Sequence, residues 1–209
     1  MMKHLQKLGK AMMLPVAALP ICGILMGLGY ALAPAAMGAA GATTGFAYVL
    51  GVFLIKAGAA LIDNMAILFA IGVGVGLTKD NDGTAGLAGM VSYLMMTTLL
   101  APGTVSTIAP FMINEINSVA YAKTAGNAFI GILGGIIGGV CYNKFKGTKL
   151  PDFLAFFSGK RAVAIVTAVV SIVVSAILLF VRPLIFPGPY EIGQAIVSLD
   201  PVGPRLYAF

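Results

Sequence analysis

Residues 144–161 read KFKGTKLPDFLAFFSGKR, and they lie between two long apolar runs with a single acid, Asp152, among five cations. The cations are Lys144, Lys146, Lys149, Lys160 and Arg161. A basic loop between two membrane-spanning segments normally stays on the cytoplasmic side. The simplest interpretation is therefore a positive-inside loop with an interfacial aromatic anchor. Because its middle, LPDFLAFF, is apolar and aromatic, we also expect it to fold back against the membrane face or into a pocket there.

The composition places the rest of the chain in a membrane. Of 209 residues, 59% are hydrophobic and only 10% are charged, whereas soluble domains contain about 25% charged residues. The apolar runs are continuous over helix-spanning lengths and do not alternate, which favours helices over a barrel. The 27 glycines fit this class, because small residues let membrane helices approach closely. The sequence predicts an all-α, polytopic helical membrane protein with about five transmembrane helices and no soluble domain.

Five apolar runs are expected to span the membrane. They are residues 11–33, 64–78, 84–101, 124–143 and 162–180. Residues 46–63 are interrupted by Lys56 and predict an interfacial helix or a tilted partial span. The last run is expected to stop at Arg182-Pro183.

Two of these runs carry more detailed signals. Pro15 and Pro20 should kink the first run, since each removes a backbone donor. Gly23 and Gly27 form a G-x-x-x-G pattern that is compatible with close helix packing. In the third run Gly86, Gly89 and Ser92 are expected to face neighbouring helices.

The polar connections indicate helix ends. Asp63-Asn64 is interpreted as an N-cap for the run 64–78. The turn KDNDG, residues 79–83, is interpreted as a capped helix-to-helix turn, because the ligand pattern of an EF-hand calcium loop is incomplete here. Residues 102–122 are expected to form a polar loop.

The distribution of cations predicts the orientation. With alternating spans and a cytoplasmic N-terminus, nine cations fall inside and four outside, which favours this topology. The inside set is Lys3, Lys7, Lys10, Lys79, Lys144, Lys146, Lys149, Lys160 and Arg161, and the outside set is Lys56, Lys123, Arg182 and Arg205.

The residues offer little catalytic chemistry, and we predict no catalytic residue, cofactor or metal. His4 is the only histidine, and Cys22 and Cys141 lie in apolar runs where they read as small buried hydrophobes. No Walker A motif is present. The net charge of +6 sits in loops at helix ends, so it indicates lipid and orientation and not nucleic acid. These observations predict a transporter or part of one.

Three stretches resemble the membrane (IIC) subunit of glucose-class sugar permeases of the bacterial phosphotransferase system. They are LQKLGKAMMLPVAALPICGILMGLG (5–29), DNMAILFAIGVGVGLTKDNDGTAGLAGMVSYL (63–94) and KLPDFLAFFSGKRAVAIVT (149–167). Glucose and N-acetylglucosamine permeases look closest, and maltose and glucoside relatives stay open.

The resemblance implies a mechanism and a set of partners. Sugar binds in the membrane subunit and is phosphorylated at the cytoplasmic side by a phosphocysteine on a IIB domain. The phosphate comes from phosphoenolpyruvate through the soluble carriers HPr and IIA. Lys149, Lys160 and Arg161 match the family's cytoplasmic loop, and with Asp152 they are the candidates to face substrate or IIB. A multi-pass location in the bacterial cytoplasmic membrane and a homodimer are implied as well.

The family's later motifs are missing from this sequence. A histidine pair, G-I-T-E-P and the IIB motif C-I-T-R-L-R do not occur. Residues 1–209 therefore resemble the first half of a permease, which in relatives forms the dimer-contacting scaffold, and we expect this half not to transport or phosphorylate sugar alone. Two alternatives stay open, namely a secondary sugar carrier and a membrane scaffold without transport activity.

Overall fold

A computed structural model describes residues 2–38, 41, 43–112, 121, 126–149, 156 and 158–185. Every regular element in these residues is a helix, which confirms the predicted all-α class. The α-helices are α1 Met2–Val16, α2 Leu19–Leu32, α3 Phe46–Asp63, α4 Met65–Gly76, α5 Gly83–Leu99, α6 Pro102–Ile108, α8 Ala128–Phe145 and α9 Lys160–Ile185, with short 3₁₀ helices η1 Pro34–Met37 and η2 Pro110–Met112.

Several helices are long and apolar enough to cross a membrane. Within the described residues these are α3, α8 and the Lys160–Val181 part of α9. The helices α5 and α6, which meet at an angle of 62°, would make a fourth span if taken together. The shorter helices α2 and α4 are apolar too. The protein is thus a polytopic helical membrane protein, and α3, predicted as an interfacial or partial span, is as long as a full span.

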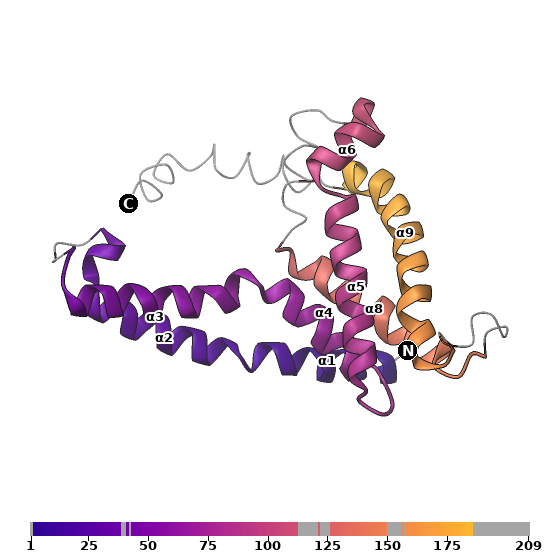
Figure 1. The fold of residues 1–209 in the computed structure, drawn as a ribbon, viewed down its shortest axis with the longest axis horizontal. Coiled ribbons are helices and arrows are strands. Elements are labelled where there is room, and N and C mark those ends of the chain that lie inside the picture. Colours follow the sequence, from indigo (N-terminus) through magenta and orange to yellow (C-terminus); the bar gives the residue numbers. More distant parts are fainter. Residues whose placement is uncertain are drawn as a thin grey trace.

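The helices form a bundle with a projecting arm (Figure 1). The bundle consists of α4, α5, α8 and α9, and α1 lies against α4. Its core is built largely of small and aliphatic side chains with two tyrosines, among them Ala66, Met96, Tyr142 and Val163. The helices α2 and α3 pack on each other and run side by side away from the bundle.

The predicted kink in the first span is confirmed. The chain leaves the helix at Ala17 and Ala18, between α1 and α2. Pro15 lies in the last turn of α1, and Pro20 in the first turn of α2, where its missing N–H removes no intrahelical bond. Gly23 and Gly27 pack against no other helix of the described residues, because a Cβ at either position would meet none of their atoms within 4 Å.

The close contacts between α2 and α3 are made at other residues of the two helices. A Cβ on Gly29 would lie 2.7 Å from the carbonyl oxygen of Gly51, so the two backbones touch there. As predicted, Cys22 and Cys141 are both buried, the first at the same interface and the second in the bundle.

Glycines also bring α8 against α4 and α5. A Cβ on Gly131 would overlap the carbonyl oxygen of Ala66 in α4, and one on Gly138 would overlap the backbone nitrogen of Gly89 in α5. Gly86 likewise touches α4, and Ser92 is fully buried. The prediction that Gly86, Gly89 and Ser92 face neighbouring helices is therefore confirmed.

The predicted boundary at Asp63-Asn64 is confirmed, because Asn64 is the N-cap residue of α4. Its side chain makes no capping bond, however, and its amide nitrogen donates to the carbonyl of Ala60 at the end of α3. Two other predicted boundaries are wrong. Part of the expected loop 102–122 is the helix α6, which Pro102 can begin because proline suits the first helical position. The helix α9 does not stop at Arg182-Pro183 but continues to Ile185.

Candidate functional site

The turn between α4 and α5, residues 77–82, carries two carboxylates. Asp82 is the N-cap of α5, and its carboxylate accepts a hydrogen bond from the backbone N–H of Thr84 at 2.8 Å. Asn81 has a positive φ of 50°, a conformation that asparagine tolerates better than most residues. The prediction of a capped helix-to-helix turn is confirmed.

Asp80 is bound to the end of α8. Its Oδ2 accepts a hydrogen bond from the Tyr142 hydroxyl at 2.9 Å and one from the Lys146 ammonium, also at 2.9 Å. The Lys146 ammonium lies 5.1 Å from the centre of the Tyr142 ring, which favours the cation by a cation–π interaction. One acid on the turn thus binds two side chains at the end of α8, Tyr142 within the helix and Lys146 directly after it.

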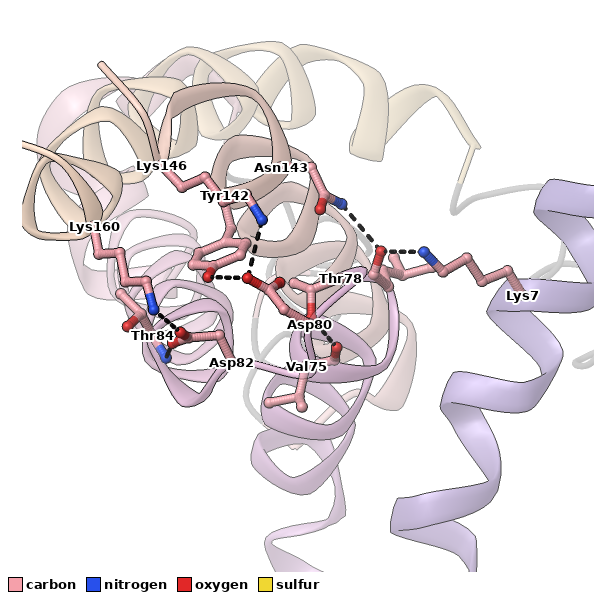
Figure 2. A network of polar contacts seen from close by, with 11 residues as sticks. Lys7, Val75, Thr78, Asp80, Asp82, Thr84, Tyr142, Asn143, Lys146 and Lys160 are labelled. Carbon is pink, nitrogen blue, oxygen red and sulfur yellow. Dashed lines mark hydrogen bonds and ion pairs between the residues drawn. The ribbon is translucent and has the colours of Figure 1, made fainter. Parts of the chain in front are cut away.

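Asp82 is bound to the start of α9. Its Oδ2 forms an ion pair with the ammonium of Lys160, the first residue of that helix. The Asp82 side chain is 19% exposed, whereas that of Lys160 is 57% exposed, so the carboxylate is the more enclosed partner. We call Asp80, Asp82, Tyr142, Lys146 and Lys160 the polar cluster (Figure 2).

The end of α4 is held by two further helices. The carbonyl oxygen of Leu77 accepts hydrogen bonds from the Lys7 ammonium at 2.8 Å and from the Asn143 amide at 3.0 Å. Carbonyls in the last turn of a helix have no intrahelical partner, so these donors satisfy one of them. Lys7 comes from α1 and Asn143 from α8, and in Figure 2 their side chains reach one shared oxygen atom from different sides.

Both carboxylates of the polar cluster are held in their charged form. The hydrogen bonds from Lys146 and then from Tyr142 lower the pKa of Asp80 below its usual value. The hydrogen bond from Lys160, followed by those from Thr84, holds the pKa of Asp82 well below its usual range. Two negative and two positive side chains therefore face each other at neutral pH, and the cluster is close to electrically balanced.

The four predicted site residues have different surroundings. Lys149 is exposed, just beyond the end of α8. Lys160 faces Asp82 in the polar cluster. The Arg161 guanidinium lies 4.7 Å from the centre of the Phe156 ring and donates to the Phe156 carbonyl at 3.1 Å. Asp152 lies outside the described residues.

Sequence reasoning missed Asp80, Asp82 and Tyr142 as members of a site. The available signal was charge complementarity, since one short turn carried two acids and one cation, Lys79, while two lysines flanked the basic loop. Among the described residues, no group of three His, Cys, Asp or Glu side chains could hold a metal ion. The polar cluster is suited to holding charged helix ends together.

Apolar helices with charged side chains gathered at their ends define this chain as a polytopic membrane protein. Residues 9–209 match the family described as "Phosphotransferase system, EIIC". The chain belongs to this family of membrane components.

Curated relatives match almost all of the chain. It is 36% identical to the N-acetylglucosamine-specific EIICB component of Bacillus subtilis (strain 168) over 99% of its length, and 36% identical to the N-acetylglucosamine-specific EIICBA component of Escherichia coli (strain K12) over 98%. It is 38% identical to a glucoside-specific EIICBA component of Staphylococcus carnosus (strain TM300) over 86%. The chain spans only 39%, 26% and 28%, respectively, of these relatives.

Proposed function

We propose that residues 1–209 are the N-terminal scaffold half of the membrane subunit of a phosphoenolpyruvate-dependent sugar permease. The permease translocates N-acetylglucosamine or glucose for phosphorylation by the phosphocysteine of a IIB domain, which HPr and IIA recharge. It works as a homodimer in the bacterial cytoplasmic membrane. The observation that carries the proposal is the match of nearly the whole chain, at 36% identity, to two components named as N-acetylglucosamine-specific.

The arrangement of charge supports a cytoplasmic position for one end of the bundle. The helices α4 and α8 end there, and α5 and α9 begin there, so Lys146 and Lys160 meet at the polar cluster. Lys7 of α1 reaches the same end. All three belong to the set of cations expected inside the cell, and positively charged side chains favour that side.

The cations differ in what they can do for a phosphorylated partner. Lys149 is exposed beside the cluster, where a positive charge would speed the approach of an anionic IIB surface. The charge of Lys160 is matched by Asp82, and the guanidinium of Arg161 lies over Phe156. Of the predicted residues that the structure describes, Lys149 is therefore the strongest candidate to meet IIB.

The test uses the complete reading frame that contains this chain, in bacteria that lack their own N-acetylglucosamine and glucose permeases. Inverted membrane vesicles receive the soluble carriers and radiolabelled N-acetylglucosamine, glucose or an aryl glucoside. We expect sugar phosphate to form only when phosphoenolpyruvate is present, and most rapidly with N-acetylglucosamine.

Two results would overturn the proposal. Accumulation of unmodified sugar that needs an ion gradient and stops with an ionophore would indicate a secondary carrier. A folded protein that binds and modifies none of the three sugars would indicate a membrane scaffold without transport activity.

A further inference from the structure

The two ends of the basic loop lie next to each other. The loop, residues 147–159, leaves the end of α8 and returns to the start of α9. Near its base the backbone N–H of Gly159 donates to the carbonyl of Thr148 at 3.0 Å. Lys146 immediately precedes the loop and Lys160 immediately follows it.

A single turn holds both of these lysines. Asp80 binds Lys146 at 2.9 Å, and Asp82, two residues later, binds Lys160. The turn itself is anchored, because Asp82 also caps α5 and the Leu77 carbonyl accepts from α1 and α8. Figure 2 shows the two acids pointing to different lysines from neighbouring positions of the same turn.

We propose that Asp80 and Asp82 are positioning residues that clamp both ends of the basic loop 147–159 to the α4–α5 turn. The clamp fixes the base from which Lys149 is presented, and its value for phosphoryl transfer rests on the function proposed above. Holding both ends is what distinguishes the arrangement from an ordinary surface ion pair. If one pair is lost, the other still fixes its own helix end, but the two ends of the loop are no longer held to a common support.

The geometry gives the clamp two measurable properties. The Lys146 and Asp80 side chains are 35% and 41% exposed, so their attraction should weaken as salt screens it. Tyr142, an uncharged donor, adds a hydrogen bond to the Asp80 carboxylate that is less sensitive to salt than the ion pair. The Asp82–Lys160 pair, which has the more enclosed carboxylate, should resist salt longer than the Asp80–Lys146 pair.

A spin label at Lys149→Cys reports the position of the loop directly. The full reading frame is placed in lipid nanodiscs with Cys22→Ala and Cys141→Ala, so that the label has one site on this chain. Asp80→Asn and Asp82→Asn are then introduced together. Asparagine still caps a helix, so Asp82→Asn removes the ion pair and keeps the cap of α5.

We expect the label to move about twofold to fivefold faster in the double variant, the range that follows from the strength of exposed ion pairs. Asp63→Asn, which removes an exposed acid at the α3–α4 junction, is the matched control and should leave the label unchanged. Unchanged mobility in Asp80→Asn/Asp82→Asn would overturn the clamp.

Two further measurements decide the question even if that variant folds poorly. Raising the salt concentration to about 1 M should mobilise the label in the protein with its native turn, and an immobile label there would contradict the clamp. A double-mutant cycle compares Asp82→Asn, Lys160→Gln and the variant that carries both. The effect of both changes together on the mobility of the label should be little larger than the effect of either change alone. Fully additive effects would show that the two side chains act independently.

The phosphorylation assay separates the clamp from the proposed function. With the native residue at Lys149, Asp80→Asn/Asp82→Asn should lower kcat about twofold to fivefold and leave KM for sugar unchanged, because the clamp as proposed positions Lys149 for the IIB donor and not for the sugar. A label that responds while no sugar is phosphorylated by the native protein would leave the clamp standing and overturn the function. A label that does not respond while phosphorylation proceeds would overturn the clamp and leave the proposed function standing.

Discussion

Asp80 and Asp82 show how two nearby acids can be accommodated at a helix junction. Two carboxylates in one turn repel each other unless each meets its own cation or donor. Here each faces a different lysine, and Asp82 also receives the N–H of Thr84. The carboxylate of Asp82 accepts a hydrogen bond in the first turn of α5 and at the same time binds Lys160 of α9.

The pH dependence of stability follows from these carboxylates. The pKa values of Asp80 and Asp82 are held below the ordinary value of 3.8. The unfolded chain therefore takes up protons first as pH falls. The two acids stabilise the fold fully at a pH above their pKa in the unfolded chain. This stabilisation is lost as the pH drops below that pKa towards their lower pKa values in the folded protein.

We expect the melting temperature of the native protein to exceed that of Asp80→Asn/Asp82→Asn by a constant amount from about pH 8 to about pH 5. The difference should shrink below about pH 4. Thermal unfolding in detergent at a series of pH values measures it. A difference that grew as pH fell would contradict the lowered pKa values.

At this scale the sequence predicts which residues are charged but not which partners they meet. The loop lysines and Arg161 were recognised from their place between two apolar runs. Their contacts depend on segments far away in the chain, since Lys146 and Lys160 meet acids 66 and 78 positions earlier. No local pattern contains that information, and so Asp80 and Asp82 were recognised only as a turn with a cap.

Between elements, glycine determines where the helices of the bundle meet. The backbones of α4 and α8 touch at Gly131, and those of α5 and α8 touch at Gly89 and Gly138. In lipid, helices gain little from burying apolar surface, so close packing of this kind supplies much of the attraction. The same reasoning explains why glycines that meet nothing, such as Gly23, contribute no packing.

We predict that Gly131→Ala destabilises the protein by about 1–3 kcal/mol, because the new methyl group would overlap the backbone of Ala66. Gly23→Ala is the control. Gly23 of α2 faces open space, so this substitution should be neutral or stabilising, since alanine favours a helix more than glycine does. Reversible unfolding in mixed micelles compares the two, and equal effects would be inconsistent with the contact at Gly131.

A buried hydroxyl pair joins α5 to α9. The Oγ of Ser171 lies 2.8 Å from the Oγ of Ser92, and both residues are fully buried. Hydrogen bonds between membrane helices contribute about 0.6 kcal/mol on average. We expect Ser92→Ala and Ser171→Ala each to lower stability by about that amount, and the double variant to lose less than their sum.

The control for this pair is Ser106→Ala in α6. Ser106 is exposed and its hydroxyl bonds only to the Gly103 carbonyl of the same helix, so little change is expected. Unfolding of all four variants under the same conditions gives the coupling. Strict additivity of Ser92→Ala and Ser171→Ala would contradict an interaction across the interface.

The predicted elements were most accurate where one long apolar run makes one helix, as in α8 and α9. The break at Asn64 between α3 and α4 was also predicted, although the Asn64 side chain bonds to the helix before it. The prediction failed at α6. The helix α6 is only seven residues long, and the polar and proline-containing stretch around it resembled a loop.

For the whole molecule, the gathering of cations at one end gives a testable orientation. We predict that a membrane-impermeant maleimide labels Lys149→Cys in inverted vesicles and not in intact cells. Thr107→Cys, exposed in α6 beyond the opposite end of α5, should show the reverse pattern. Both variants are made with Cys22 and Cys141 replaced by alanine. Labelling of Lys149→Cys in intact cells would overturn the cytoplasmic assignment and, with it, the access of a IIB donor to the loop.

The two breaks that separate the arm from the bundle lie at one level. Gly72 of α4 touches Pro15 of α1, and Gly58 of α3 touches the backbone of Cys22 in α2. The break at Ala17 and Ala18 and the break at Asn64 therefore both fall between these two contacts. If a force moved the far ends of α2 and α3, both helices would be expected to rotate together about Ala17, Ala18 and Asn64. The glycine contacts of α8 lie outside this pair of helices and would be unchanged.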